Sequence, residues 1–137
     1  MHFQVPEAPV AADDEHIIAK TRAYNERFVA DDYAPLSVYC RDDSGKLVGG
    51  LTGKTYWNYL DIEFLWVEEA HRQHGLAAEI MRQAETEAIG RGCKYAMLDT
   101  YEFQALGFYQ KQGYNIFGQI DDYCGAYERY YLRKVLQ

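Results

Sequence analysis

An arginine, a glycine and an alanine follow one another at short spacing, Arg72-x-x-Gly75-x-Ala77, where an apolar run ends and a long amphipathic pattern begins. The first turn of a helix carries unpaired N–H groups and the positive end of the helix dipole, so it favours an anion. Gly75 has no Cβ and lets a ligand approach the backbone, and the small Ala77 keeps that approach open. Arg72 adds a charge that can bind phosphate oxygens. The stretch predicts a pyrophosphate site, with a tight turn and a surface charge as the alternative.

Other nucleotide and metal patterns are absent from the sequence. The chain contains no G-x-x-x-x-G-K-[ST] and no G-x-G-x-x-G after its first predicted strand, so a phosphate site here belongs to another class. His71 and His74 are three residues apart, but no third ligand follows in pattern, and we expect no metal site.

Hydrophobic periodicity indicates the elements that position the Arg72–Ala77 stretch. A helix over about 75–89 follows it and has one apolar side, formed by Leu76, Ile80, Met81, Ala84 and Ala88. A strand at 59–67 precedes it, and the period of two divides that strand into two faces. Asp61, Glu63, Leu65 and Val67 are predicted on one face, and Ile62, Phe64 and Trp66 on the other.

The order of the elements predicts an α/β fold with a mixed sheet in one domain over residues 1–137. The helical crossover from Val67 to Lys94 implies a parallel strand pair. The other predicted elements are a short strand at 2–5, a helix at 15–29 capped by Asp13 or Asp14, a hairpin over 36–51 that turns at 43–45, a strand at 94–100, a helix at 102–112, and a closing hairpin of strands 114–120 and 126–136.

The bulk composition bounds the classes of partner. A chain of 137 residues is long enough for one core, and no apolar run is long enough to span a bilayer. The net charge of −7 argues against nucleic acid or an anionic membrane as partner. Three widely spaced cysteines and no recognisable secretory signal predict a cytoplasmic protein with reduced thiols. Acidic doublets supply much of the charge, either for capping and solubility or to attract a cationic substrate.

Two segments together resemble the GNAT superfamily of acetyl-CoA-dependent N-acetyltransferases. Arg72-x-x-Gly75-x-Ala77 resembles its acetyl-CoA signature, Q/R-x-x-G-x-G/A. Downstream, LDTYEFQALGFYQKQGY resembles the second signature, in which an Ala is followed four residues later by a Tyr and then by Gly-Tyr or Gly-Phe. The resemblance covers about residues 36–136. It implies a single-domain GNAT-like fold, a mixed, mostly antiparallel sheet with a splayed parallel strand pair and flanking helices.

The resemblance implies that acetyl-CoA is the acetyl donor. Its pyrophosphate is expected on the backbone of Arg72, Gln73, His74, Gly75, Leu76 and Ala77. Its pantetheine is expected to pair with Leu65, Trp66 and Val67 as an added strand, where a backbone N–H stabilises the oxyanion. Thr100 and Glu102 are also expected to contact the cofactor, although Glu102 stands where many members have Asn or Ser.

The same resemblance suggests the groups that move protons. Tyr109, in the second signature, is expected to protonate the departing thiolate, because a phenol of pKa about 10 can donate to a thiolate of pKa about 8.5. The alternative for Tyr109 is a core aromatic that packs with Leu106. Glu63 or Asp61, just before the cofactor strand, is expected to remove the proton of the acceptor amine, directly or through water. The alternative for both carboxylates is a solvent-facing position on the strand.

The predicted reaction is acetyl transfer to a primary amine of a small, cationic molecule by direct attack in a ternary complex. Tyr24, Phe28 and Tyr123 are expected to line the acceptor pocket, although sheet packing alone explains most of the tyrosines. A protein lysine or N-terminal amine is the alternative acceptor. A CoA-binding sensor or interaction module without turnover is the alternative class, and a homodimer is a possible assembly.

Overall fold

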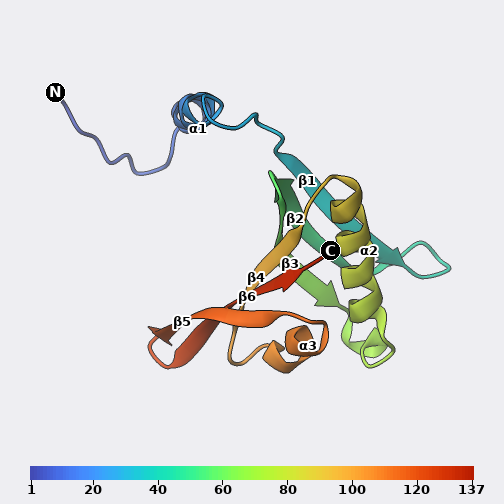
Figure 1. The fold of residues 1–137 in the computed structure, drawn as a ribbon. Coiled ribbons are helices and arrows are strands. Elements are labelled where there is room, and N and C mark those ends of the chain that lie inside the picture. The colour runs from blue at the N-terminus through green and yellow to red at the C-terminus, as the bar shows by residue number, and fades with distance from the viewer. The chain divides into compact units, whose positions relative to one another are not determined.

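The computed structural model describes residues 1–137 as two compact units, 1–32 and 33–137, and each is described by itself. The first holds helix α1 (Ala11–Asn25), blue in Figure 1, in which no residue is buried. The helix begins at Ala11 rather than at the predicted Glu15, because the Val10 carbonyl already accepts the N–H groups of Asp13 and Asp14. These two carboxylates therefore lie in the first turn, where they face the positive end of the dipole, and do not cap the helix.

The strand predicted at residues 2–5 is wrong. These residues are exposed and form neither helix nor strand. Pro6 follows them and lacks a backbone N–H, so the short run has no continuation that donates to a neighbouring strand. Nowhere in the chain is there a helix with the length and the apolar character that crossing a membrane requires.

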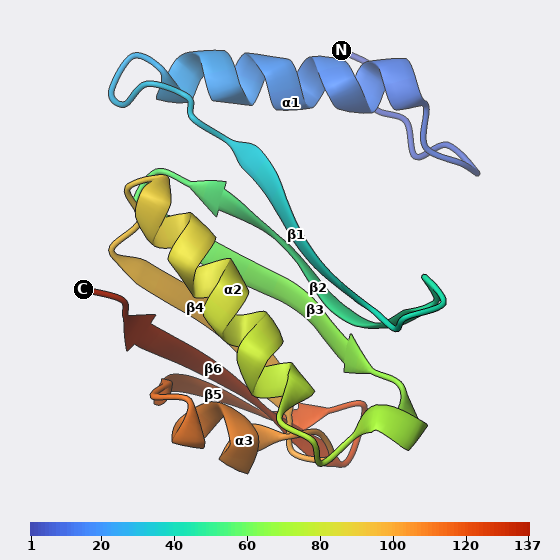
Figure 2. The same cartoon turned by 90° about the vertical axis from the view of Figure 1, so that its right-hand side faces the viewer.

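The second unit is built on a six-stranded sheet in the order β1-β2-β3-β4-β6-β5. Neighbouring strands are antiparallel except β3 and β4, which are parallel as the helical crossover predicts. Figure 2 shows α2 and α3 in front of this sheet. The arrangement confirms the predicted fold class. The bounds are β1 (Ala34–Arg41), β2 (Leu47–Tyr56), β3 (Tyr59–Val67), η1 (Glu69–His71), α2 (Leu76–Gly90), β4 (Tyr95–Tyr101), α3 (Leu106–Lys111), β5 (Asn115–Tyr123) and β6 (Tyr127–Val135).

Helix α3 is shorter than predicted, because residues 102–105 form a turn instead of its first helical turn. The side chain of Gln104 closes this turn. Its Oε1 accepts hydrogen bonds from the Tyr101 N–H at 3.0 Å and from the Thr100 hydroxyl at 3.1 Å. The end of β4 is therefore fixed before α3 begins.

The parallel pairing of β3 with β4 is very short. Tyr59, Leu60 and Asp61 face Tyr95, Ala96 and Met97, and the ladder ends there. Strand β3 continues to Val67 and stays paired with β2 along its other edge. From residue 62 onward, β3 consequently has an edge that β4 does not cover, and a gap opens between the two strands.

A β-bulge changes which side chains of β3 share a face. Thr52 pairs with Phe64 and Gly53 pairs with Ile62, so Glu63 is an extra residue on β3. The prediction that Asp61 and Glu63 share a face with Leu65 and Val67 is wrong for this reason. Val67 and the half-buried Leu65 join the core with Leu60 and Ile62. Asp61 and Glu63 both reach Lys54 on β2, and Phe64 and Trp66 are exposed.

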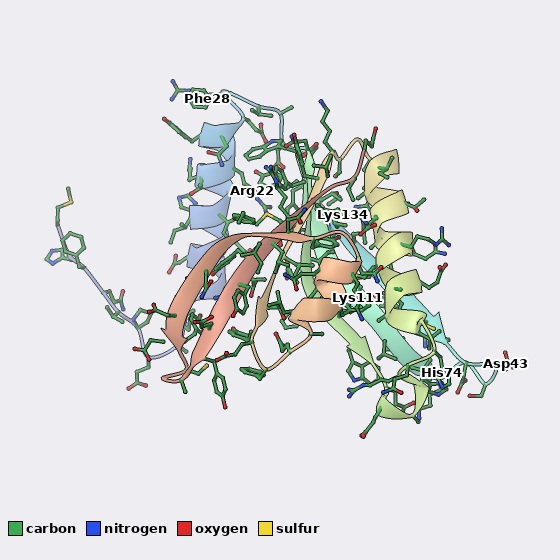
Figure 3. The ribbon with its side chains drawn as sticks, turned by 60° about the horizontal axis from the view of Figure 1, so that its bottom comes forward. Arg22, Phe28, Asp43, His74, Lys111 and Lys134 are labelled. Atoms are coloured by element: carbon green, nitrogen blue, oxygen red, sulfur yellow. The ribbon has the colours of Figure 1, made fainter.

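The core lies between the sheet and α2. The period of 3.6 residues correctly predicts Ile80, Met81, Ala84 and Ala88 as the buried face of this helix. A polar link also joins α2 to the last strands. Glu85 accepts hydrogen bonds from the Tyr114 hydroxyl and from Lys134 Nζ, both at 2.8 Å, and Lys134 is labelled in Figure 3.

The bulge predicts a specific sensitivity at Gly53. An alanine Cβ there would overlap the carbonyl oxygen of Asp61, so Gly53→Ala must displace the bulge. We expect the free energy of unfolding to fall by about 1–3 kcal/mol in urea titrations. Gly107→Ala is the control, because no atom lies within 4 Å of its added Cβ and α3 gains helix propensity. Equal stability of the two variants would contradict the tight packing at the bulge.

Candidate functional site

The loop between β3 and α2 presents unpaired backbone amides to a cavity. Gln73 and Gly75 have positive φ values of 65° and 76°, so the chain turns sharply into the helix. No side chain caps α2, and its first intrahelical bond runs from the Glu79 N–H to the Gly75 carbonyl. The N–H groups of the preceding three helical residues therefore have no partner within the helix. A cavity of about 240 Å³ lies against this turn, and Gly75, Leu76, Ala77 and Ala78 are among its lining residues.

Arg72 ties the middle of this loop to the end of β3. Its Nε donates a hydrogen bond of 2.9 Å to the carbonyl of Val67, the last residue of β3. This bond uses one of the five N–H donors of the guanidinium group. Arg72 also lines the cavity at the helix start, as the phosphate-site prediction requires of it. His74 is exposed in the same loop (Figure 3) and does not line this cavity, so its contact with the cofactor stays a prediction.

A larger cavity, called the trough below, runs from this turn past the end of β3 to α3. Its volume is about 690 Å³. It shares Val67, Arg72 and Ala77 with the cavity at the helix start, so the two spaces lie side by side. Leu65 and Trp66 line the trough on one side and Phe108 and Tyr109 line it on another. The trough therefore follows the part of β3 that β4 leaves uncovered.

A third cavity, the acidic cavity, holds about 440 Å³ and has a strongly polar lining. Three carboxylates line it, from Asp61, Glu63 and Asp99, together with two cations, Lys54 and Arg129. Lys54 Nζ lies 3.3 Å from Glu63 Oε1 and 3.7 Å from Asp61 Oδ2. Arg129 binds Asp99 through Nε and Nη2, both at 2.9 Å. With every group ionised, the lining carries one more negative than positive charge.

Burial raises the pKa of Asp61 above its ordinary value. The ammonium of Lys54 opposes this rise in pKa, whereas the charges of Glu63 and Asp99 add to it. A carboxyl group whose pKa is raised is a better proton acceptor near neutral pH, as a general base must be. Asp61 is half-buried and lines the acidic cavity, whereas Glu63 is exposed, and the role of either as general base stays a prediction.

Tyr109 stands where the trough meets the acidic cavity. It lines both, as do Leu65 and Gln104. Burial, with a contribution from the charge of Asp99, raises the pKa of the phenol, which keeps it protonated at neutral pH. The ring also packs at an edge against Phe108 and Tyr114 with centroid distances of 5.3 and 6.4 Å. The core-packing interpretation of Tyr109 therefore holds for its ring, while the residue still lines both cavities.

The remaining predicted residues are less directly placed. Thr100 is buried, and the Glu102 carboxylate accepts a hydrogen bond of 3.1 Å from the Glu128 N–H, so their cofactor contacts stay predictions. The Tyr123 hydroxyl accepts a bond of 2.9 Å from Nη1 of Arg129, a residue that lines the acidic cavity. Tyr24 and Phe28 belong to the first unit, where their rings are 5.5 Å apart and exposed, and their acceptor role also stays a prediction.

Sequence reasoning missed Lys54, Asp99 and Arg129. Lys54 is the cross-strand partner of Asp61, which the hairpin register alone could have indicated. Asp99 lies on β4 at the point where the parallel pair diverges, so its carboxylate meets those of β3 only through the fold. Arg129 is brought to Asp99 by the pairing of β4 with β6, which is distant in sequence.

Comparisons with known proteins agree with this geometry. A family model described as the acetyltransferase (GNAT) family matches residues 4–114. The chain is 39% identical over 93 residues to blasticidin-S acetyltransferase of Streptomyces morookaense, spanning 65% of this chain and 68% of the relative. It is 34% identical over 121 residues to an acetyltransferase of Agrobacterium fabrum, spanning 88% of each chain.

Solved structures share the fold. A candidate acetyltransferase from Agrobacterium tumefaciens superposes with a TM-score of 0.90 at 30% identity, covering 98% of this chain and 99% of that one. An aminoglycoside 6'-N-acetyltransferase crystallised with coenzyme A superposes with a TM-score of 0.69 at 18% identity, covering 75% and 73% of the two chains. The second likeness is one of fold.

The acidic cavity predicts how Asp61 responds to loss of Lys54. Lys54→Met removes the charge that holds the pKa of Asp61 down, so we expect this pKa to rise further. A raised carboxyl pKa stabilises the fold below the unfolded value of about 3.9, and this contribution is lost as the pH rises through the folded pKa. The variant should therefore lose stability at pH 7 and recover toward the wild type as the pH falls to about 4.

Carboxyl-carbon NMR titration and urea unfolding at both pH values measure these effects. Lys46→Met is the control, because Lys46 pairs with Glu68 at 2.9 Å and does not line the acidic cavity. An unchanged Asp61 pKa in Lys54→Met would show that the two groups are not coupled.

Proposed function

The chain belongs to the GNAT family of acetyltransferases, and we propose that it transfers an acetyl group from acetyl-CoA to a primary amine of a small, cationic molecule. The observation that carries this proposal is the position of Tyr109 at the junction of the trough with the acidic cavity. The trough suits a long acetyl donor whose phosphates bind at the N-terminus of α2. The acidic cavity suits a cationic acceptor. Because the two spaces meet, donor and acceptor can bind together, which supports direct attack in a ternary complex.

The residues around the trough fit the acetyl donor. The uncapped amides of α2, Arg72 and the open space at Gly75 form a concavity suited to pyrophosphate oxygens. Leu65, Trp66 and Val67 lie on the part of β3 that β4 does not pair with, so their edge can take an added strand such as pantetheine. A backbone N–H of Leu65 or Trp66 on this edge would bind the carbonyl oxygen as negative charge develops on it.

The acidic cavity suits the acceptor amine and its proton. Acetyl-CoA supplies the thioester that the amine attacks. An amine attacks only as the free base, and Asp61, with its raised pKa, is the best-placed proton acceptor, with Glu63 or a water as the intermediary. The amine nitrogen forms the new C–N bond and then loses its second proton to water in the acidic cavity, the C–S bond breaks, and the Tyr109 hydroxyl donates its proton to the leaving sulfur. Proton exchange with solvent through the open acidic cavity then restores both groups.

Two alternative functions can be distinguished from this proposal by experiment. A protein lysine or N-terminal amine also presents a cation, but a relative at 39% identity is a blasticidin-S acetyltransferase, which favours a small molecule. A CoA-binding module without turnover would need neither a raised Asp61 pKa nor Tyr109 at the junction. Thiol release from acetyl-CoA with a panel of small diamines, compared with lysine-containing peptides, separates these cases.

Tyr109→Phe removes the proposed acid but keeps the ring that packs against Phe108. We expect kcat to fall about 100-fold or more, in the range that general acid catalysis contributes, while acetyl-CoA affinity stays within about twofold. Thiol-release kinetics and calorimetric titration measure the two quantities. Tyr127→Phe, at an exposed position on β6, serves as the control. A mutant with wild-type kcat would remove Tyr109 as the acid.

Gly75→Glu places bulk and negative charge at the start of α2, and we expect acetyl-CoA binding to disappear because the carboxylate competes with the phosphates. Gly90→Glu, at the opposite end of the same helix and equally open, should bind normally. Gly75→Ala carries the strain of the positive φ without the charge, so it reports the backbone contribution alone. Unchanged titration calorimetry for Gly75→Glu would refute the pyrophosphate site.

A further inference from the structure

An aromatic hollow adjoins the acidic cavity. It holds about 170 Å³, and Tyr39, Phe64, Trp66 and Thr52 are among its lining residues. Three large rings are exposed there, Tyr39 by 63%, Phe64 by 73% and Trp66 by 48%. The proposed reaction does not use these rings.

The strand register gives the hollow the form of a slot. Tyr39 pairs with Gly50, and Gly50 pairs with Trp66, so a residue without a side chain separates two aromatic residues in one cross-strand row. Neighbouring strands lie about 4.8 Å apart, which puts the outer two strands of this row about 10 Å apart. A flat ring in contact with another ring on each face needs about 7 Å. The space above Gly50 is therefore wide enough for one planar group to stack between the two rings.

The slot borders the acidic cavity at Phe64 and differs from it in charge. Phe64 lines both spaces and is the side chain at their border. At the acidic end lie the carboxylates of Asp61, Glu63 and Asp99. At the far end, the guanidinium of Arg41 lies 5.8 Å from the centroid of the Tyr39 ring. A ligand that spans both spaces is accordingly expected to be cationic at one end and flat and uncharged at the other.

We propose that the acceptor carries an uncharged aromatic or heteroaromatic ring, which binds in the slot between Tyr39 and Trp66 while its amino groups lie in the acidic cavity. This inference rests on the proposed function and narrows its substrate class. Simple aliphatic polyamines would use the acidic cavity and leave the slot unfilled. Stacking on two rings would then appear in KM, because the ring is remote from the bonds that change.

Two diamines of equal charge test the ring requirement, N-benzyl-1,3-diaminopropane and N-(cyclohexylmethyl)-1,3-diaminopropane. They differ in flatness and in the π face, and N-methyl-1,3-diaminopropane supplies the core without a ring. We expect the wild type to show a KM for the benzyl compound roughly threefold to tenfold below that for the cyclohexyl compound. Tyr39→Ala should remove this preference without changing kcat or the KM of the methyl compound. Tyr39→Phe should keep it.

Phe117→Ala is the matched control, since it removes an aromatic side chain that is 61% exposed on β5, outside the slot. Gly50 is left unaltered, because a Cβ there would lie 2.6 Å from the Val38 carbonyl oxygen and disturb the sheet itself. Titration calorimetry of the same diamines without acetyl-CoA gives a readout that does not need turnover.

The outcomes separate the inference from the proposed function. Ring-dependent binding that Tyr39→Ala abolishes, in a protein that acetylates none of the diamines, would support the slot and overturn the proposed reaction. Acetylation of all three compounds with equal KM would support the reaction and overturn the slot. A change of oligomeric state in Tyr39→Ala by light scattering, with no ring preference in the wild type, would also overturn it and assign these rings to contact between copies of the chain.

Discussion

Three residues of parallel pairing between β3 and β4 are the constraint on which the site depends. A longer ladder would close the gap and use the backbone N–H and C=O groups of β3 from residue 62 onward. With three pairs, β3 and β4 are held together at one end and separate at the other. The trough and the acidic cavity both lie along the part of β3 that is separated from β4. Tyr109 reaches the place where these spaces meet.

The bulge at Glu63 determines which carboxylates face this gap. Without the extra residue, strict alternation along β3 would put Asp61 and Glu63 on the same face as Leu65 and Val67. The bulge lets both carboxylates reach Lys54 while Val67 still enters the core. Glycine at position 53 permits the close approach of the Asp61 carbonyl, so the placement of the carboxylates begins on the neighbouring strand.

Much of the fold could be predicted from the sequence, because local periodicity carries it. Helix α2, the first hairpin and the parallel crossover follow from apolar spacing and turn residues that lie near one another in the chain. The bulge could not be predicted this way, since the register between β2 and β3 creates it. Asp99 and Arg129 could not be predicted for the same reason, because the pairing of β4 with β3 and β6 brings them to the site, whereas Lys54 follows from the hairpin register of β2 and β3. The strand predicted at the N-terminus is wrong for a different reason, because a run with strand-like composition forms no strand without a partner strand.

The hydrogen bonds of Glu85 with Tyr114 and Lys134 connect α2 to the second half of the sheet. The helix packs on β1, β2 and β3, and Glu85 fastens it to the start of β5 and to β6. Spreading the two halves of the sheet would pull a largely covered carboxylate away from both donors, at a cost of about 1–3 kcal/mol for each group left unsatisfied. Lys134 pairs with Ala96 and Ala96 pairs with Leu60, so this link acts where β3 and β4 are still paired and resists separation of the two halves of the sheet at the closed end of the gap.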